Sequence, residues 1–190
     1  GFGLSQGNVS ELKFGDDTVA IAPDDAVVVA VPPRPATSLL PGLKAPSKFR
    51  AIVNAHFRFD PPKDMPPILG VVGGTVEWLF AFPQRISVTI SNGDRLVDMP
   101  REELAQAIWQ DIRKAAVVQD ELPPWQIVRE RRATFEATPE QNALRPGAIT
   151  NWKNLFLAGD WTDTDLPATI EGSVRSGNRA ADLVFAMRKP

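Results

Sequence analysis

Residues 154–181 read NLFLAGDWTDTDLPATIEGSVRSGNRAA, and this stretch decides how the whole sequence is interpreted. Its apolar start predicts a short buried strand, Gly159 and Asp160 predict a turn, and a polar loop then leads to a helix. A strand–turn–helix of this kind brings free backbone N–H groups and the positive end of a helix to one spot. We therefore consider a site for an anion or a nucleotide. On this chemistry alone, a tightly crossing strand–helix unit without a ligand is slightly favoured.

Two further features of this stretch suit a ligand. Asp160 follows the predicted strand directly, where its carboxylate could accept hydrogen bonds from ligand hydroxyls. The helix carries residues with small side chains, which predict a nearly flat face open to a planar ligand or a neighbouring backbone: Gly172, Ser173, Ser176, Gly177, Ala180 and Ala181.

The stretch closely resembles the C-terminal FAD motif of the flavin amine oxidase and carotenoid desaturase superfamily. The resemblance implies that Asp160 bonds hydroxyls of FAD and that the backbone N–H of Ile170 meets the N1/O2 edge of the flavin. Glu171 is expected to orient the backbone or to pair with Arg175 one turn on. The cofactor-binding residues that the resemblance implies are Gly159, Asp160, Thr169, Ile170, Glu171 and Gly172.

Further stretches resemble the squalene-associated, FAD-dependent desaturase subgroup, among them 52–59, 78–80, 86–91, 132–135 and 159–164. The subgroup's implied activity is reductive dehydroxylation of hydroxysqualene to squalene in hopanoid biosynthesis, on an isoprenoid lipid substrate. Reduced FAD would deliver the hydride, and NADPH or a similar donor would reduce the flavin. A carotenoid or phytoene-type desaturase and a non-catalytic fragment that retains the motif remain alternatives. An amine oxidase is less favoured, because those enzymes often use tyrosines beside the flavin and this sequence has none.

The order of predicted elements indicates an α+β fold. A mixed or antiparallel substrate-domain sheet with few helices would be joined to the last strand and helix of an incomplete, Rossmann-like FAD domain. The predicted divisions are 1–33 for the end of the FAD-domain sheet, 34–150 for most of a substrate-binding domain, and 151–190 for the FAD-binding strand, loop and helix. No G-x-G-x-x-G turn follows a strand in residues 1–190, so we expect the N-terminal FAD-binding half to be missing and the fragment to be inactive alone.

Local patterns predict the remaining elements. A hairpin is expected around Gly15, and an apolar run at 26–31 predicts a strand buried on both faces. A helix beginning near Asp98, which could cap it, has a buried stripe at every fourth residue. The arginines of the strand at 125–134 are expected to form a solvated edge.

Few side chains suit catalysis. His56 is the sole histidine, and a lone histidine is more often structural than catalytic, so it and Arg58 on the same strand face are weak candidates. The catalytic acid is thus unknown. Trp78, Phe80 and Phe82 alternate along a strand and share one face, where core packing and the lining of a substrate cavity are equally favoured.

Composition limits the remaining functions. The sequence has no cysteine and one histidine, which excludes disulfides and a multi-histidine metal site, so no metal is expected. A net charge of −2 gives no basic surface for nucleic acid. With no apolar run long enough to span a bilayer, we expect a cytoplasmic protein. Peripheral contact at the inner membrane is an analogy from the lipid substrate.

Overall fold

The computed structural model describes residues 1–188. The chain divides into two compact units. Unit 1 combines residues 1–48 with residues 135–190, and unit 2 is the continuous segment 49–134. Each unit carries its own sheets and helices and is described by itself.

Unit 1 contains two small sheets. The first is antiparallel in the order β1-β2-β3, and its β2–β3 turn at Gly15 confirms the predicted hairpin. The second pairs β4 with β10 in parallel, so two strands more than 120 residues apart in sequence lie side by side. The elements of this unit are β1 (Phe2–Ser5), β2 (Asn8–Phe14), β3 (Asp17–Ala20), β4 (Val27–Val29), α1 (Pro33–Leu39), α3 (Pro139–Asn142), β10 (Leu155–Leu157) and α4 (Ile170–Met187).

Strand β4 departs from the sequence prediction. Val27 and Val29 are buried, but Val28 between them is 43% exposed, so the expectation of a strand buried on both faces is wrong within this chain. Side chains alternate between the faces of a strand, and only the face of Val27 and Val29 is packed in the part of unit 1 that the structure describes. β10 is the better buried partner, since all three of its residues are buried.

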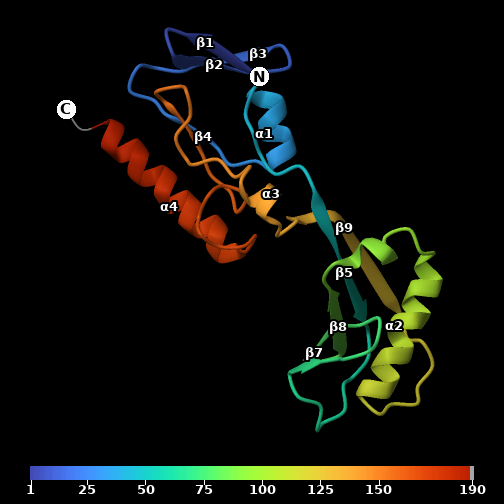
Figure 1. Cartoon of the computed structure of the whole chain (residues 1–190). Coiled ribbons are helices and arrows are strands. Elements are labelled where there is room, and N and C mark those ends of the chain that lie inside the picture. Colours follow the sequence, from blue (N-terminus) through green and yellow to red (C-terminus); the bar gives the residue numbers. More distant parts are fainter. Residues whose placement is uncertain (189–190) are drawn as a thin grey trace. The chain divides into compact units, whose positions relative to one another are not determined.

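Unit 2 is a five-stranded sheet in the order β6-β7-β8-β5-β9, with α2 packed against one face (Figure 1). Leu104, Ile108 and Ile112 of α2 are fully buried, which confirms the stripe predicted from their spacing. Alternate residues of β5, β7 and β8 complete this core. The elements are β5 (Phe49–Phe57), β6 (Ile68–Gly70), β7 (Trp78–Phe82), β8 (Arg85–Ile90), η1 (Gly93–Leu96), α2 (Arg101–Ala115) and β9 (Trp125–Phe135).

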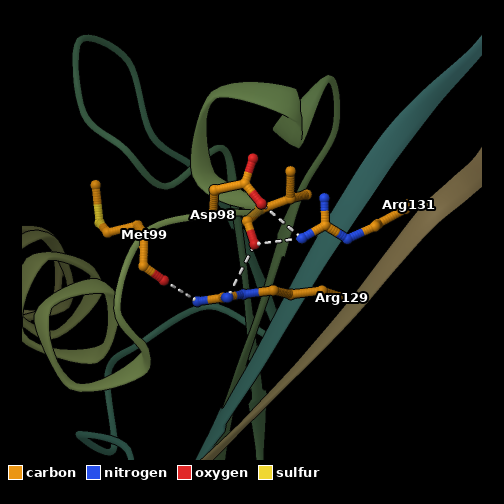
Figure 2. A network of polar contacts seen from close by, with 5 residues as sticks. Asp98, Met99, Arg129 and Arg131 are labelled. Atoms are coloured by element: carbon orange, nitrogen blue, oxygen red, sulfur yellow. Dashed lines mark hydrogen bonds and ion pairs between the residues drawn. The ribbon is translucent and has the colours of Figure 1, made fainter.

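The start of α2 is held by arginines of β9 and not by a side-chain cap (Figure 2). Arg129 donates to the backbone oxygens of Val97 and Met99 at 2.9 and 2.6 Å. Arg131 donates to Val97 O and to Asp98 Oδ1, the latter at 2.7 Å. The predicted cap by Asp98 is therefore wrong, because its carboxylate is engaged by a strand residue and Pro100 occupies the N-cap position. Nor are these two arginines merely a solvated edge, since they fix the segment that leads into α2.

The end of α2 contains a strained residue. Val117 has a φ of +54° and is 82% exposed, although β-branched residues rarely adopt this left-handed conformation. The next residue, Val118, is buried and donates its N–H to Arg113 O at 3.1 Å, which closes the helix in the manner of a Schellman motif. The motif favours glycine at the position that Val117 occupies.

The mixed α/β fold with antiparallel sheets that the sequence predicts is confirmed. The range 34–150, predicted as the substrate-binding domain, contains unit 2 and extends past it at both ends. The functional assignment of 1–33, 34–150 and 151–190, including the incomplete FAD domain, stays a prediction.

Candidate functional site

The turn after β10 has a conformation that requires glycine. Gly159 has a φ of +144°, and a Cβ added to it would collide with the indole ring of Trp161. Its N–H donates to Ser176 Oγ of α4 at 2.7 Å, and its carbonyl accepts from the N–H and the hydroxyl of Thr162. The turn is thus closed on itself and fastened to the helix that follows it.

Trp161 holds the same turn against Val31, two residues beyond the end of β4. Its side chain is 2% exposed, and its indole Nε1 donates to Val31 O at 3.0 Å. A buried indole with its N–H satisfied is a rigid anchor. Asp160 is therefore held between two anchored neighbours, Gly159 and Trp161.

Arg145 holds the loop that follows the turn. Its Nη2 donates to Thr162 O, Thr164 Oγ1 and Asp160 O at 2.5, 3.0 and 3.1 Å. The guanidinium also lies 5.0 Å from the ring centre of Phe135. One arginine therefore joins three residues of the 160–164 loop, which the sequence analysis did not anticipate because residues 138–150 showed no motif.

The first turn of α4 leaves two backbone donors open. Thr169 is the N-cap, and its Oγ1 accepts from the N–H of Gly172 at 3.0 Å. Within residues 1–188, the N–H groups of Ile170 and Glu171 have no acceptor, and the Ile170 side chain is 87% exposed. Glu171 pairs with Arg175 at 2.8 Å, as expected from its sequence spacing. The positive end of an 18-residue helix is thus open to a ligand.

The carboxyl of Asp160, which lies in the turn after β10, has a raised pKa. Partial burial raises the pKa of its carboxyl, while the backbone N–H groups of Asp160 and Trp161 and the charge of Arg145 act in the opposite direction. Desolvation is the largest of these effects. A half-buried carboxyl that has lost part of its hydration gains most from a ligand hydroxyl that replaces the lost water.

The small residues of α4 divide into two groups. Gly172, Ser176 and Ala180 are buried and recur every four residues, so they form the stripe along which the helix packs. At Gly172 a Cβ would lie 3.2 Å from Pro167 O, a tight contact that a larger residue could make only if the neighbouring backbone moved slightly. Ser173, Gly177 and Ala181, predicted to share the flat face, are exposed.

In unit 2, the sheet face opposite α2 holds the aromatic candidates. Trp78 and Phe82 are 47% and 41% exposed and Phe80 is half-buried, so they do not belong to the core below them. The Trp78 ring lies over Gly70, where an added Cβ would be 3.4 Å from the indole. His56 is half-buried on the same face. Arg58 is exposed, and its backbone N–H bonds Pro124 O at 2.9 Å.

Comparison with known proteins assigns the chain to a family. Residues 4–185 match the family described as flavin containing amine oxidoreductase. The chain belongs to this family. In this flavoprotein family FAD is the cofactor, which confirms the cofactor expected from residues 154–181.

Two curated relatives of this chain are named hydroxysqualene dehydroxylase. They come from Sinorhizobium fredii and Rhodopseudomonas palustris, and each is 73% identical over 94% of this chain and 43% of its own length. A probable zeta-carotene desaturase of Synechococcus elongatus is 28% identical over 53% of this chain and 21% of its own length. The chain thus spans less than half the length of the curated relatives it matches.

A solved structure supports the fold. The putative protoporphyrinogen oxidase from Exiguobacterium sp. 255-15 superposes with a TM-score of 0.71 over 98% of this chain and 45% of its own, at 17% identity. At that identity the likeness shows the fold alone. Among the described residues, no cluster of three or more His, Asp or Glu is arranged to hold a metal, and no helix is long and apolar enough to cross a membrane.

A second residue that the sequence analysis missed is Asn154. Its side chain is buried, accepts from Val9 N at 2.8 Å and donates to Val9 O at 2.9 Å. Its backbone oxygen accepts from Val27 N at 2.7 Å, so it joins β2 and β4 at the entrance to β10. No local pattern indicates such a role, because the partners lie 145 and 127 residues away.

Proposed function

We propose that this chain is the later part of an FAD-dependent oxidoreductase that converts hydroxysqualene to squalene by reductive dehydroxylation. The observation that carries this proposal is the 73% identity to hydroxysqualene dehydroxylases over 94% of the chain. The same relatives extend well beyond this chain, which supports a missing half with the glycine-rich FAD-binding turn. An isoprenoid substrate of this kind also suits the exposed aromatic rings of β7.

The residues of unit 1 fit one edge of a flavin. Asp160 would bond a hydroxyl of FAD, while the open N–H groups of Ile170 and Glu171 would face the N1/O2 edge of the ring. Gly159, Thr169 and Gly172, the other predicted cofactor residues, act by shaping the turn and the helix start and not through a side-chain contact. Reduced FAD, when bound, supplies the hydride for the reaction. The positive end of α4 would stabilise negative charge on a reduced ring bound there.

The residues of unit 2 fit the isoprenoid. Trp78, Phe80 and Phe82 offer an apolar face on which a polyisoprenoid chain can lie, and such a face keeps water from a carbon that becomes positive when its hydroxyl leaves. We do not assign a role to Arg58. Cytoplasmic location stays a prediction, and so does peripheral contact at the inner membrane, which is supported by the lipid nature of the substrate alone.

A single-turnover experiment tests the reaction. The flavin of the full-length protein is reduced chemically without oxygen and mixed with hydroxysqualene, and the products are extracted and analysed. We expect the flavin to reoxidise and squalene to appear in equal amount. Reduced flavin that persists for hours with intact hydroxysqualene would show the proposal to be wrong. Bleaching of oxidised flavin by phytoene would instead favour a desaturase.

A second measurement tests whether tight FAD binding requires residues outside this chain. Because the open edge at α4 is only part of a flavin site, the purified 190-residue chain should bind FAD weakly or not at all. Titration with FAD, followed by flavin fluorescence, gives the affinity. Stoichiometric and tight binding would show that this chain holds the cofactor by itself.

A further inference from the structure

The aromatic face of unit 2 contains a row of polar side chains that core packing does not require. Ser87 of β8 lies directly opposite His56 of β5, and Thr89 lies opposite Asn54 one row further on. His56 Nδ1 and Ser87 Oγ are 2.9 Å apart, and Thr89 Oγ1 donates to Asn54 Oδ1 at 2.8 Å. Two hydrogen-bonded pairs thus lie in the centre of the sheet, while the opposite face of β5, β7 and β8 packs apolar side chains into the core.

These polar pairs border the aromatic residues directly. Phe80 of β7 is the cross-strand neighbour of Ser87, and Trp78 is the neighbour of Thr89. The order across the sheet is therefore aromatic on β7, hydroxyl on β8, then imidazole or amide on β5. A ligand lying along β7 would pack its apolar surface on the aromatic rings, and its edge would face the polar side chains of β8 and β5.

Ser87 determines how the imidazole of His56 is presented. The serine is 7% exposed, so it is shielded from water and the bond to Nδ1 satisfies it. With Nδ1 engaged, the remaining nitrogen, Nε2, has no partner among the described residues and belongs to a half-buried side chain. The ring is thus fixed at one nitrogen and free to bond a ligand at the other.

We propose, on the basis of the function proposed above, that His56 Nε2 recognises and protonates the hydroxyl of the isoprenoid substrate, with Ser87 as its positioning residue. A protonated His56 donates its Nε2 proton to the hydroxyl oxygen, the carbon–oxygen bond breaks, and water leaves. His56 becomes neutral and keeps its Nδ1–H on Ser87 Oγ. The carbon that has lost the oxygen would then accept the hydride that reduced flavin supplies when bound, so that alcohol, the His56 proton and reduced flavin would give hydrocarbon, water and oxidised flavin.

Two probes of similar shape separate recognition of the hydroxyl from apolar binding. Farnesol carries an allylic hydroxyl on a short isoprenoid chain, and farnesene lacks the oxygen. Their dissociation constants for the FAD-loaded full-length protein are measured by equilibrium titration. Loss of one hydrogen bond in a largely apolar site corresponds to roughly 10-fold in affinity, so the native protein should prefer farnesol by about that factor.

Three single-residue variants test which side chain causes the preference for farnesol over farnesene. His56→Phe keeps the ring and removes its nitrogens, so the preference should fall below about 2-fold with farnesene binding unchanged. Phe80→Ala should weaken both probes about equally and retain the preference. Thr89→Val, the matched control, breaks the neighbouring polar pair and should leave the preference intact.

Nuclear magnetic resonance tests the positioning role, because the chain has a single histidine. Ring ¹⁵N shifts report which imidazole nitrogen carries the proton. Ser87→Ala should change this distribution and reduce the preference for farnesol, whereas Ser87→Thr should restore both. An unchanged distribution in Ser87→Ala would overturn the role of Ser87.

The outcomes separate the two proposals. If His56→Phe retains the preference for farnesol and converts hydroxysqualene at the native rate, the role of His56 is wrong while the dehydroxylation stands. If the native protein leaves hydroxysqualene intact in the single-turnover experiment, the proposed function itself fails. A farnesol preference that His56→Phe abolishes would then still establish the hydroxyl-binding site.

Discussion

Replacement of Arg145 by methionine should release the loop that carries Asp160. The guanidinium Nη2 bonds three oxygens of residues 160–164, and methionine keeps most of the apolar volume while removing every donor. A hydrogen bond from a charged donor contributes about 1.5–3 kcal/mol. Nη2 has two hydrogens for three acceptors, so we count two hydrogen bonds. After partial rehydration of the carbonyls, the closed loop should lose about 3 kcal/mol of stability.

Hydrogen exchange measures this loss locally. The amides of Thr162 and Asp163 are bonded to Gly159 O and Pro146 O at 3.1 and 2.8 Å, so they report opening of the loop. A loss of about 3 kcal/mol corresponds to roughly 100-fold faster exchange. Peptides from the β2–β3 hairpin of the same unit provide an internal reference that should not change.

Arg145→Lys is the matched control. It retains the positive charge but offers one compact ammonium group, so the loop should lose only about 1 kcal/mol and exchange about 5-fold faster. Exchange within 3-fold of native in Arg145→Met would refute the reasoning. Equal acceleration in the hairpin would also contradict it, since that pattern means destabilisation of the whole unit and not of the loop.

Three further changes test the turn and the end of α2. Asp160→Asn should weaken FAD binding by the full-length protein at least 10-fold, measured by titration, since it removes a charged acceptor. Without flavin the same variant should melt higher than native at neutral pH. Burial raises the pKa of Asp160, so ionisation of its carboxyl destabilises the fold as pH rises through that pKa. The difference in melting temperature between the variant and the native protein should therefore vanish below pH 3.8, the ordinary pKa of the aspartate side chain. Gly159→Ala should destabilise unit 1 by about 2–3 kcal/mol in urea unfolding, from the strained φ and the collision with Trp161; a loss below 0.5 would contradict the geometry. Val117→Gly should stabilise unit 2 by about 1 kcal/mol, visible as a higher melting temperature, and an unchanged or lower one would argue against strain.

Features encoded by neighbouring residues could be predicted from the sequence. The order strand, Gly-Asp turn and helix at 154–181 follows from hydrophobicity and turn chemistry, and the buried stripe of α2 follows from its period. The Glu171–Arg175 pair was likewise expected, because four residues separate them on one helix. In each case the partners lie within one or two helical turns or one strand, where local geometry alone places them.

Contacts between distant residues could not be predicted. Asn154 is bonded to Val9, 145 positions away, and His56 to Ser87, 31 positions away. Asp98 shows that the local sequence can also mislead. Its sequence context suits a helix cap, but its carboxylate is hydrogen-bonded to Arg131. The helix begins after Pro100, so Asp98 lies two residues before the N-cap and its carboxylate is free to bind Arg131.

The turn at 159–161 holds its own backbone firmly and presents the groups that a bound ligand would need. Ser176 accepts the Gly159 N–H, Arg145 holds the Asp160 carbonyl, and Trp161 is bonded to Val31. A turn held by contacts to three separate segments is already ordered before a ligand arrives, so ordering costs little at binding. What this rigid frame leaves without side-chain partners is the Asp160 carboxylate, with the two open N–H groups at the start of α4. Fixed acceptor and donors of this kind suit a ligand that offers a hydroxyl and an electron-rich edge, as a flavin cofactor does.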